Sequence, residues 1–188
     1  MADLGSEINA ALASDDPIPR DKVLVWIDAA ADLPTLAKLY RLTDEAYYRI
    51  QPDLGKEVTC ALIQRYLLEC IRQDVAGDDK IQSRFDAAQS LHLWFCQLLE
   101  MEDMSTILTG AARAVTELFL TGGEDVRYTI ETGFLEHVLE PPALRPYFEH
   151  WSSDPRLKDA WERAMEWGEA HPDYTRKLFG RLRDREDK

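Results

Sequence analysis

The 188-residue sequence contains no long apolar run and no basic, hydrophobic leader, and both absences bear on where the protein resides. Its apolar stretches, such as 61–63 and 91–99, are short or broken by polar residues, whereas a membrane-spanning helix needs roughly 20 apolar residues. Residues 1–13 include Asp3 and Glu7 but no basic residue, unlike a secretory signal. We therefore expect a cytoplasmic protein that does not associate with membranes.

Cysteine is also scarce, because the chain holds only Cys60, Cys70 and Cys96. An odd number of widely spaced cysteines does not form a disulfide framework. Each falls on an expected helix beside apolar residues, where a thiol behaves as a small buried hydrophobe. Reduced cysteines of this kind are typical of reducing compartments. We expect all three thiols to be buried and slow to react.

Signatures of catalysis and metal binding are missing from the sequence. The glycines form no phosphate-binding loop, and no His-Glu-x-x-His, Cys-x-x-Cys or Gly-x-Ser-x-Gly motif occurs. None of the four histidines follows a glutamate by three residues, as the ligands of di-iron bundles do. His92 lies between Leu91 and Leu93, which favours an interior or boundary histidine over a catalytic base. The sequence therefore predicts no enzyme, no metal site and no cofactor.

Basic residues are few: the chain has 22 Lys and Arg and 35 Asp and Glu, which gives a formal net charge of −13. Phosphate backbones repel such a chain unless it carries a segregated basic patch. The only candidate is the C-terminal tail, where six basic and four acidic residues between 173 and 188 leave a net charge of +2. We interpret the tail as a solvated last helix and expect no nucleic-acid partner.

Apolar residues recur at helical spacing in nearly every window, which predicts an all-α fold with short connections. Asp32 has the position of an N-cap before Pro34, and Gly77 that of a C-terminal cap, with Asp78 and Asp79 before the next helix. The best strand candidate, 23–27, sits within a helical window. A single compact domain over residues 1–188 is expected, and solenoid-like stacking is one form it can take. The expected helices cover 4–12, 21–31, 33–40, 43–50, 54–71, 81–99, 105–120, 124–140, 154–169 and 173–184, with a short segment at 143–151.

Carboxylates gather on one face of two of these helices. In the helix 154–169 they lie opposite an apolar face that runs from Leu157 to Trp167, and in the helix 124–140 they cluster within about 80° around Thr129. Residues 100–169 contain 15 acids and six bases, a net charge of −9. A solvated surface is one explanation, and a surface that steers a basic protein partner is the other. The candidate partner-binding residues are Asp125, Glu136, Glu140, Asp159, Glu162, Glu166 and Glu169.

Two charged residues fall near apolar helix faces and need partners, because an unpaired buried charge is costly. Arg65 lies between Leu62 and Leu68, and we expect it to pair with Glu69 or with an acid on a neighbouring helix. Glu131 is expected to form an intramolecular salt bridge. A functional carboxylate is the alternative for Glu131.

Two segments resemble known helical families. The apolar spacing from Glu124 to Leu139, with Gly133 within it, resembles one helix of an armadillo or HEAT repeat, although no second copy follows at a fixed period. Together, 130–137 and 144–151 resemble helical immunity proteins of bacterial polymorphic toxin systems. The second resemblance implies an acidic inhibitor that covers the active site of a cognate basic toxin. The alternatives are a peptide-binding scaffold of armadillo or HEAT type and a metal-dependent helical enzyme.

Overall fold

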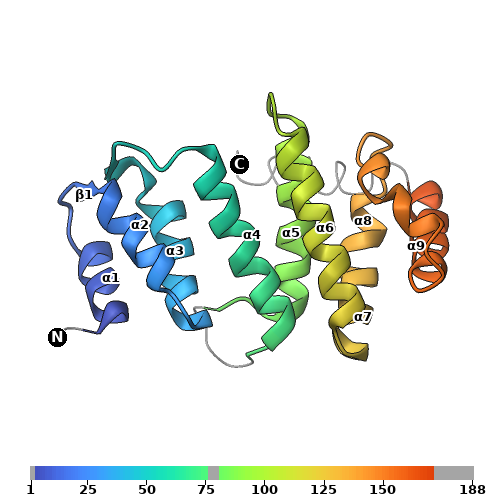
Figure 1. Cartoon of the computed structure of the whole chain (residues 1–188), viewed down its shortest axis with the longest axis horizontal. Helices are drawn as coiled ribbons and strands as arrows, with labels where there is room; N and C mark the ends of the chain where they lie inside the picture. The colour runs from blue at the N-terminus through green and yellow to red at the C-terminus, as the bar shows by residue number, and fades with distance from the viewer. Residues whose placement is uncertain (1–2, 76–80, 172–188) are drawn as a thin grey trace, which may run out of the picture. The chain divides into compact units, whose positions relative to one another are not determined.

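The computed structural model describes residues 3–75 and 81–171, and within these ranges the protein is all-α, as predicted (Figure 1). The expected caps at residues 77–79 and the expected helix 173–184 lie outside the described residues. Along the chain, the elements are α1 (Leu4–Ala13), β1 (Ile18–Pro19), α2 (Arg20–Ala29), α3 (Leu33–Glu45), the 3-10 helix η1 (Tyr47–Arg49), β2 (Ile50–Gln51), α4 (Lys56–Gln73), α5 (Arg84–Leu99), α6 (Ser105–Thr121), α7 (Glu124–Thr129), the π-helix η2 (Ile130–Leu135), α8 (Glu136–Val138), the 3-10 helix η3 (Arg145–Ser152) and α9 (Lys158–Ala170).

The chain separates into two compact units, Met1–Ser83 and Arg84–Lys188. The single domain expected over residues 1–188 stays a prediction, and so does solenoid-like stacking. Among the described residues of both units, every helix is too short or too polar to cross a membrane.

In unit 1, α3 packs against both α1 and α4. Its start follows the predicted cap, because the backbone N–H of Thr35 donates to Asp32 Oδ1 at 2.8 Å. The predicted separate helix at 43–50 is wrong, since α3 continues to Glu45. Thr43 does not begin a new helix, and its hydroxyl donates to the carbonyl of Tyr40 in the preceding turn. The strand candidate at 23–27 is helical, and the only strands in the described part of unit 1 are the parallel pair β1–β2, in which Ile18 opposes Ile50.

Arginine side chains close two helix ends in unit 1. Arg65 donates to the backbone carbonyls of Ile27 and Ala30 at the end of α2, so the expected carboxylate partner is wrong. Arg49 is buried and donates to the carbonyl of Ala11, near the end of α1, at 2.7 Å. The last carbonyls of a helix have no intrahelical hydrogen-bond partner and carry partial negative charge. They therefore accept hydrogen bonds from a guanidinium, which then needs no carboxylate partner.

Unit 2 is built around α5, which packs against η2 and α8. Its core contains a cluster of buried aromatic rings, in which Phe95 lies 5.2 Å from Phe134 and 5.8 Å from Phe148 between ring centroids. Trp151 is fully buried beside Phe148, and its indole N–H donates to Thr116 Oγ1 at 2.8 Å. This core fixes the positions of α7, η2 and α9, the elements that carry most of the candidate surface residues.

The predicted helix 124–140 is helical as far as Val138, but its middle turn is a π-helix. Gln89 of α5 donates its side-chain N–H to the carbonyl of Gly133 at 3.0 Å, which supports this segment. A Cβ at Gly133 would lie only 3.0 Å from the Cβ of Ala88, so η2 approaches α5 closely at this point. A π turn contains one more residue than an α turn, and it therefore rotates every later side chain relative to an ideal helical wheel.

Candidate functional site

The acidic face predicted for residues 154–169 is present on α9. Its carboxylates follow an i, i+3, i+7, i+10 spacing, and all of them are exposed to solvent, whereas Leu157, Ala160 and Ala164 on the other side are buried. The helix begins at Lys158 and not at 154, because the side chain of Asp154 accepts from the backbone N–H of Arg156 in a tight turn. We call the four exposed carboxylates the α9 stripe: Asp159, Glu162, Glu166 and Glu169.

Basic side chains make a few long contacts with the α9 stripe, and Arg163 interacts electrostatically with Asp159. Lys158 Nζ lies 3.6 Å from a carboxylate oxygen of Glu162, and Arg145 Nη1 lies 4.0 Å from one of Glu169. Exposed pairs of this kind contribute about 0–1 kcal/mol and exchange readily with other partners. The α9 stripe therefore remains open to an incoming basic group.

The second predicted stripe does not form a continuous surface. Asp125 is exposed near Arg84, but Glu136 is half-buried, and burial raises the pKa of its carboxyl. Glu140 is only 4% exposed, and one of its oxygens lies 3.0 Å from His137 Nδ1. The grouping of these three carboxylates on one face assumed an ideal α-helix as far as residue 140. The turn at 130–135 is instead a π-helix, which changes the direction of Glu136 relative to Asp125, and the helix ends at Val138, before Glu140. The prediction that Glu140 belongs to the partner-binding surface is therefore wrong, because Glu140 is buried.

Glu140 belongs to a buried polar cluster that joins α5 to the segment around α8 and to α9. The rings of His92 and His137 lie 5.2 Å apart, and His137 makes an edge contact with Trp167 at 4.7 Å. His92 is 3% exposed, as the interior interpretation predicted, and burial with the nearby His137 lowers its pKa to about 4. Across residues 3–75 and 81–171, no three His, Cys, Asp or Glu side chains are arranged to hold a metal ion. The cluster is best explained as packing between helices.

The cysteines are free thiols inside the two units. Cys60 and Cys70 are buried, which confirms the prediction for them, whereas Cys96 is partly exposed. Burial raises the pKa of the Cys60 thiol and raises those of Cys70 and Cys96 to about 11. Glu140 contributes to the raised pKa of Cys96. A thiol with a raised pKa is a poor nucleophile at neutral pH, so we expect all three cysteines to react slowly with thiol reagents.

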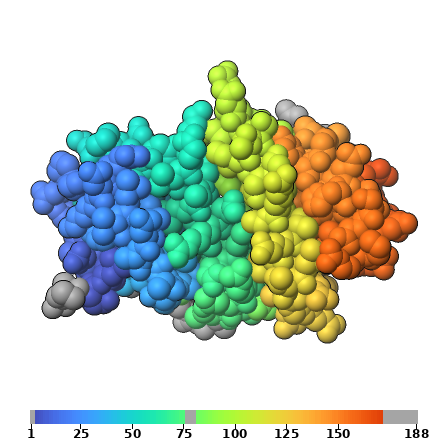
Figure 2. All heavy atoms as spheres, in the orientation of Figure 1, coloured from blue at the N-terminus to red at the C-terminus, as the bar shows by residue number. Residues whose placement is uncertain are grey.

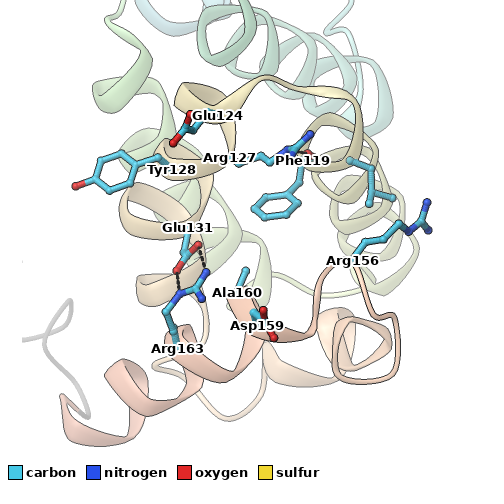
Figure 3. A pocket seen from close by; sticks show the side chains of 10 residues that line it. Phe119, Glu124, Arg127, Tyr128, Glu131, Arg156, Asp159, Ala160 and Arg163 are labelled. Atoms are coloured by element: carbon cyan, nitrogen blue, oxygen red, sulfur yellow. Dashed lines mark hydrogen bonds and ion pairs between the residues drawn. The ribbon is translucent and has the colours of Figure 1, made fainter.

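Unit 2 also contains a groove of about 600 Å³ between the end of α6, α7 with η2, and α9 (Figure 3). Glu131 and Arg163 form a bidentate ion pair across it, at 2.5 and 2.9 Å, which confirms the salt bridge expected for Glu131. The sequence analysis did not identify this groove, although Glu124, Tyr128 and Glu131 have the spacing of residues that share a helix face. The groove is lined by Phe119, Leu120, Glu124, Arg127, Tyr128, Glu131, Arg156, Asp159, Ala160 and Arg163.

A third acidic feature is the loop between α5 and α6, which projects beyond the ends of these helices in the space-filling view (Figure 2). Its residues Glu100, Glu102 and Asp103 are exposed, and Met101 between them is 47% exposed. The helical-wheel argument could not find these carboxylates, because they lie outside the regular helices.

Comparison of the chain with protein-family models, with curated proteins and with solved structures gives no match. The resemblances to immunity proteins and to armadillo or HEAT repeats therefore stay predictions. Only the exposed surfaces and the groove described above indicate what the protein binds.

Proposed function

We propose that this protein is a protein-binding inhibitor of the immunity type, without enzymatic activity, that neutralises a cognate basic bacterial toxin in the cytoplasm by covering its active site. The observation that carries the proposal is the α9 stripe. Its four carboxylates form one exposed line along a helix whose opposite side is anchored in the core of unit 2. A fixed line of charge suits a basic surface because no loop has to be ordered when the partner binds.

The charge of the surrounding unit supports the same conclusion. Residues 84–171 contain 16 acidic and seven basic side chains, which leaves a net charge of −9. The projecting loop adds Glu100, Glu102 and Asp103 to the exposed acids of this unit. A field of this sign accelerates the encounter with a basic partner and repels nucleic acid, which would compete for the same toxin surface.

Paired charge-reversal variants test the role of the α9 stripe. Glu162 and Glu166 would both be changed to Lys, and a control variant would carry Asp28→Lys and Asp44→Lys, which are exposed residues of unit 1 with the same change in net charge. Each protein would be used to capture partners from the native host, and the captured basic protein would be purified and assayed for toxicity with and without the inhibitor.

We expect wild type and control to bind and neutralise the toxin, with association slowing as salt rises, and the α9 variant to bind more weakly. Equal affinity and equal association rates for all three proteins would remove the α9 stripe from the interface. Failure of wild type to neutralise any captured protein would overturn the inhibitor proposal itself.

A further inference from the structure

The groove of unit 2 has the chemistry of a receptor for a single cationic side chain. Building on the proposed function, we infer that this groove takes a lysine or arginine side chain of the protein partner, held between the Tyr128 ring and the carboxylates of Glu124 and Glu131. This assigns an anchor residue to the interface, in addition to the long-range attraction from the α9 stripe.

The three residues are brought together by the helix that carries them. Glu124 and Tyr128 lie one turn apart in α7, and Glu131 follows at the start of η2, so all three side chains reach the groove. Tyr128 is 68% exposed, so the face of its ring is accessible to an incoming group. Figure 3 shows the Tyr128 ring beside Glu124, directed away from Arg127. The face of a tyrosine ring attracts a cation, and neighbouring carboxylates strengthen that attraction.

Two of the three arginines that line the groove are held by carboxylates, so they do not leave free positive charge for an anion. Arg163 is held by Glu131, and Arg156 by Asp154 at 2.7 Å. Arg127 donates through Nε to the carbonyl of Phe119 at 3.2 Å. This carbonyl does not neutralise Arg127, but Glu124 and Asp159, which form no ion pair within residues 3–75 and 81–171, outnumber it, and the groove therefore favours a cation over an anion.

Glu124 is in the opposite situation, because it is exposed and forms no ion pair or side-chain hydrogen bond with any residue in 3–75 or 81–171. An incoming ammonium or guanidinium group therefore gains an uncompensated carboxylate at Glu124. It can also share Glu131, whose bidentate partner Arg163 is itself largely exposed. The partner that fits this arrangement is basic, which agrees in sign with the α9 stripe.

The test uses the full chain and a defined probe, acetyl-Arg-Arg-Arg-amide, titrated into the ¹⁵N-labelled protein and followed by NMR. Acetyl-Glu-Glu-Glu-amide is the charge control. We expect the arginine peptide to shift amide signals of 124–131 and 159–163 in a saturable manner, and the glutamate peptide to leave them unchanged.

Two variants and two matched controls test the anchor directly. Tyr128→Ala should weaken binding of the arginine peptide about three- to tenfold, the range of a lost cation–π contact. Tyr48→Ala, which removes a 65% exposed tyrosine of unit 1, should leave it unchanged. Glu124→Gln should weaken binding, whereas Glu57→Gln, an exposed glutamate of unit 1, should not. These residues are exposed, so their substitution should preserve the fold, which circular dichroism would verify.

Shifts spread over the whole acidic surface, equal losses in Tyr128→Ala and Tyr48→Ala, or equal binding of the glutamate peptide would each overturn the inference. Its failure is distinguishable from failure of the proposed function. If reversal of Glu162 and Glu166 abolishes toxin binding while Tyr128→Ala changes the affinity for neither toxin nor peptide, the inhibitor function is supported and the cation site in the groove is refuted. If the arginine peptide binds the groove but no captured protein is neutralised, the cation site stands and the inhibitor function falls.

Discussion

His92 should make the stability of unit 2 depend on pH between about 6.5 and 4. In the unfolded chain its imidazole has the ordinary pKa of 6.5, whereas in the folded protein the pKa is lowered to about 4, first by burial and then by the nearby His137. The Glu140 carboxylate acts in the opposite direction but does not restore the ordinary pKa. Within this window the unfolded chain binds a proton that the folded chain does not, so acidification favours unfolding.

The size of the effect follows from the two pKa values. A lowering by roughly 2.5 units corresponds to about 3 kcal/mol, at about 1.36 kcal/mol per unit. The stabilising contribution is present in full above pH 6.5 and is lost as the pH falls towards 4. Between pH 7 and pH 5 the lost part is about 2 kcal/mol.

The measurement is urea unfolding at pH 7, 6 and 5, followed by tryptophan fluorescence, because four of the five tryptophans lie in unit 2. His92→Gln keeps hydrogen-bonding groups but cannot titrate, and its free energy of unfolding should fall about 2 kcal/mol less than that of wild type between pH 7 and 5. Equal pH dependence of wild type and His92→Gln would refute the reasoning.

Three further predictions concern packing, capping and reactivity. Gly133→Ala should destabilise unit 2 by about 1–3 kcal/mol, because its Cβ would meet that of Ala88, whereas Gly110→Ala, with open space around it in α6, should stabilise by about 0.5–1 kcal/mol. Asp32→Ala should lower the free energy of unfolding by about 0.5–2 kcal/mol, and Asp3→Ala by less, because only Asp32 forms the side-chain cap. Cys60 and Cys70 should react slowly with a thiol reagent until the protein is denatured because they are buried, and the partly exposed Cys96 should react slowly because its pKa is raised to about 11. Rapid labelling of any one in the native protein at neutral pH would contradict this reasoning.

The sequence predicted those features that depend on a few neighbouring residues. The cap at Asp32, the end of α6 before Gly122 and the solvent-exposed side of α9 all follow from local spacing and turn chemistry, and the structure confirms them. The wrong prediction of a helix at 43–50 has the same origin. Thr43 looks like a helix start when only its neighbours in sequence are considered, but it lies inside α3, which packs against α1 and α4. Local preference decides an element only where packing does not oppose it.

The features that the sequence did not reveal depend on the main chain or on distant residues. No side-chain pattern marks the π-helix at 130–135, which is held by Gln89 from another helix. The helix also ends at Val138, two residues before its expected end, and Glu140 lies in the core and not on the expected surface. The groove is likewise formed only when α9 packs against η2 and Arg163 reaches Glu131. Its residues are separated by up to 44 positions along the chain, from 119 to 163, so helical periodicity within one segment cannot predict it.

The corrected positions of the carboxylates change what the acidic surface can do. With Glu140 buried and Glu136 half-buried, the exposed carboxylates of unit 2 do not form two parallel stripes. They include one stripe on α9, the projecting loop at 100–103, and Glu124 at the groove with Asp125 beside it. Long-range attraction depends on the total charge and tolerates this rearrangement, because it sums over many groups. Selection of one partner requires a fixed local geometry, and the groove supplies it by combining the aromatic face of Tyr128 with the carboxylate of Glu124. Reversal of the α9 stripe should therefore slow association, whereas loss of Tyr128 should mainly accelerate dissociation, and stopped-flow measurement of both rates would separate the two roles.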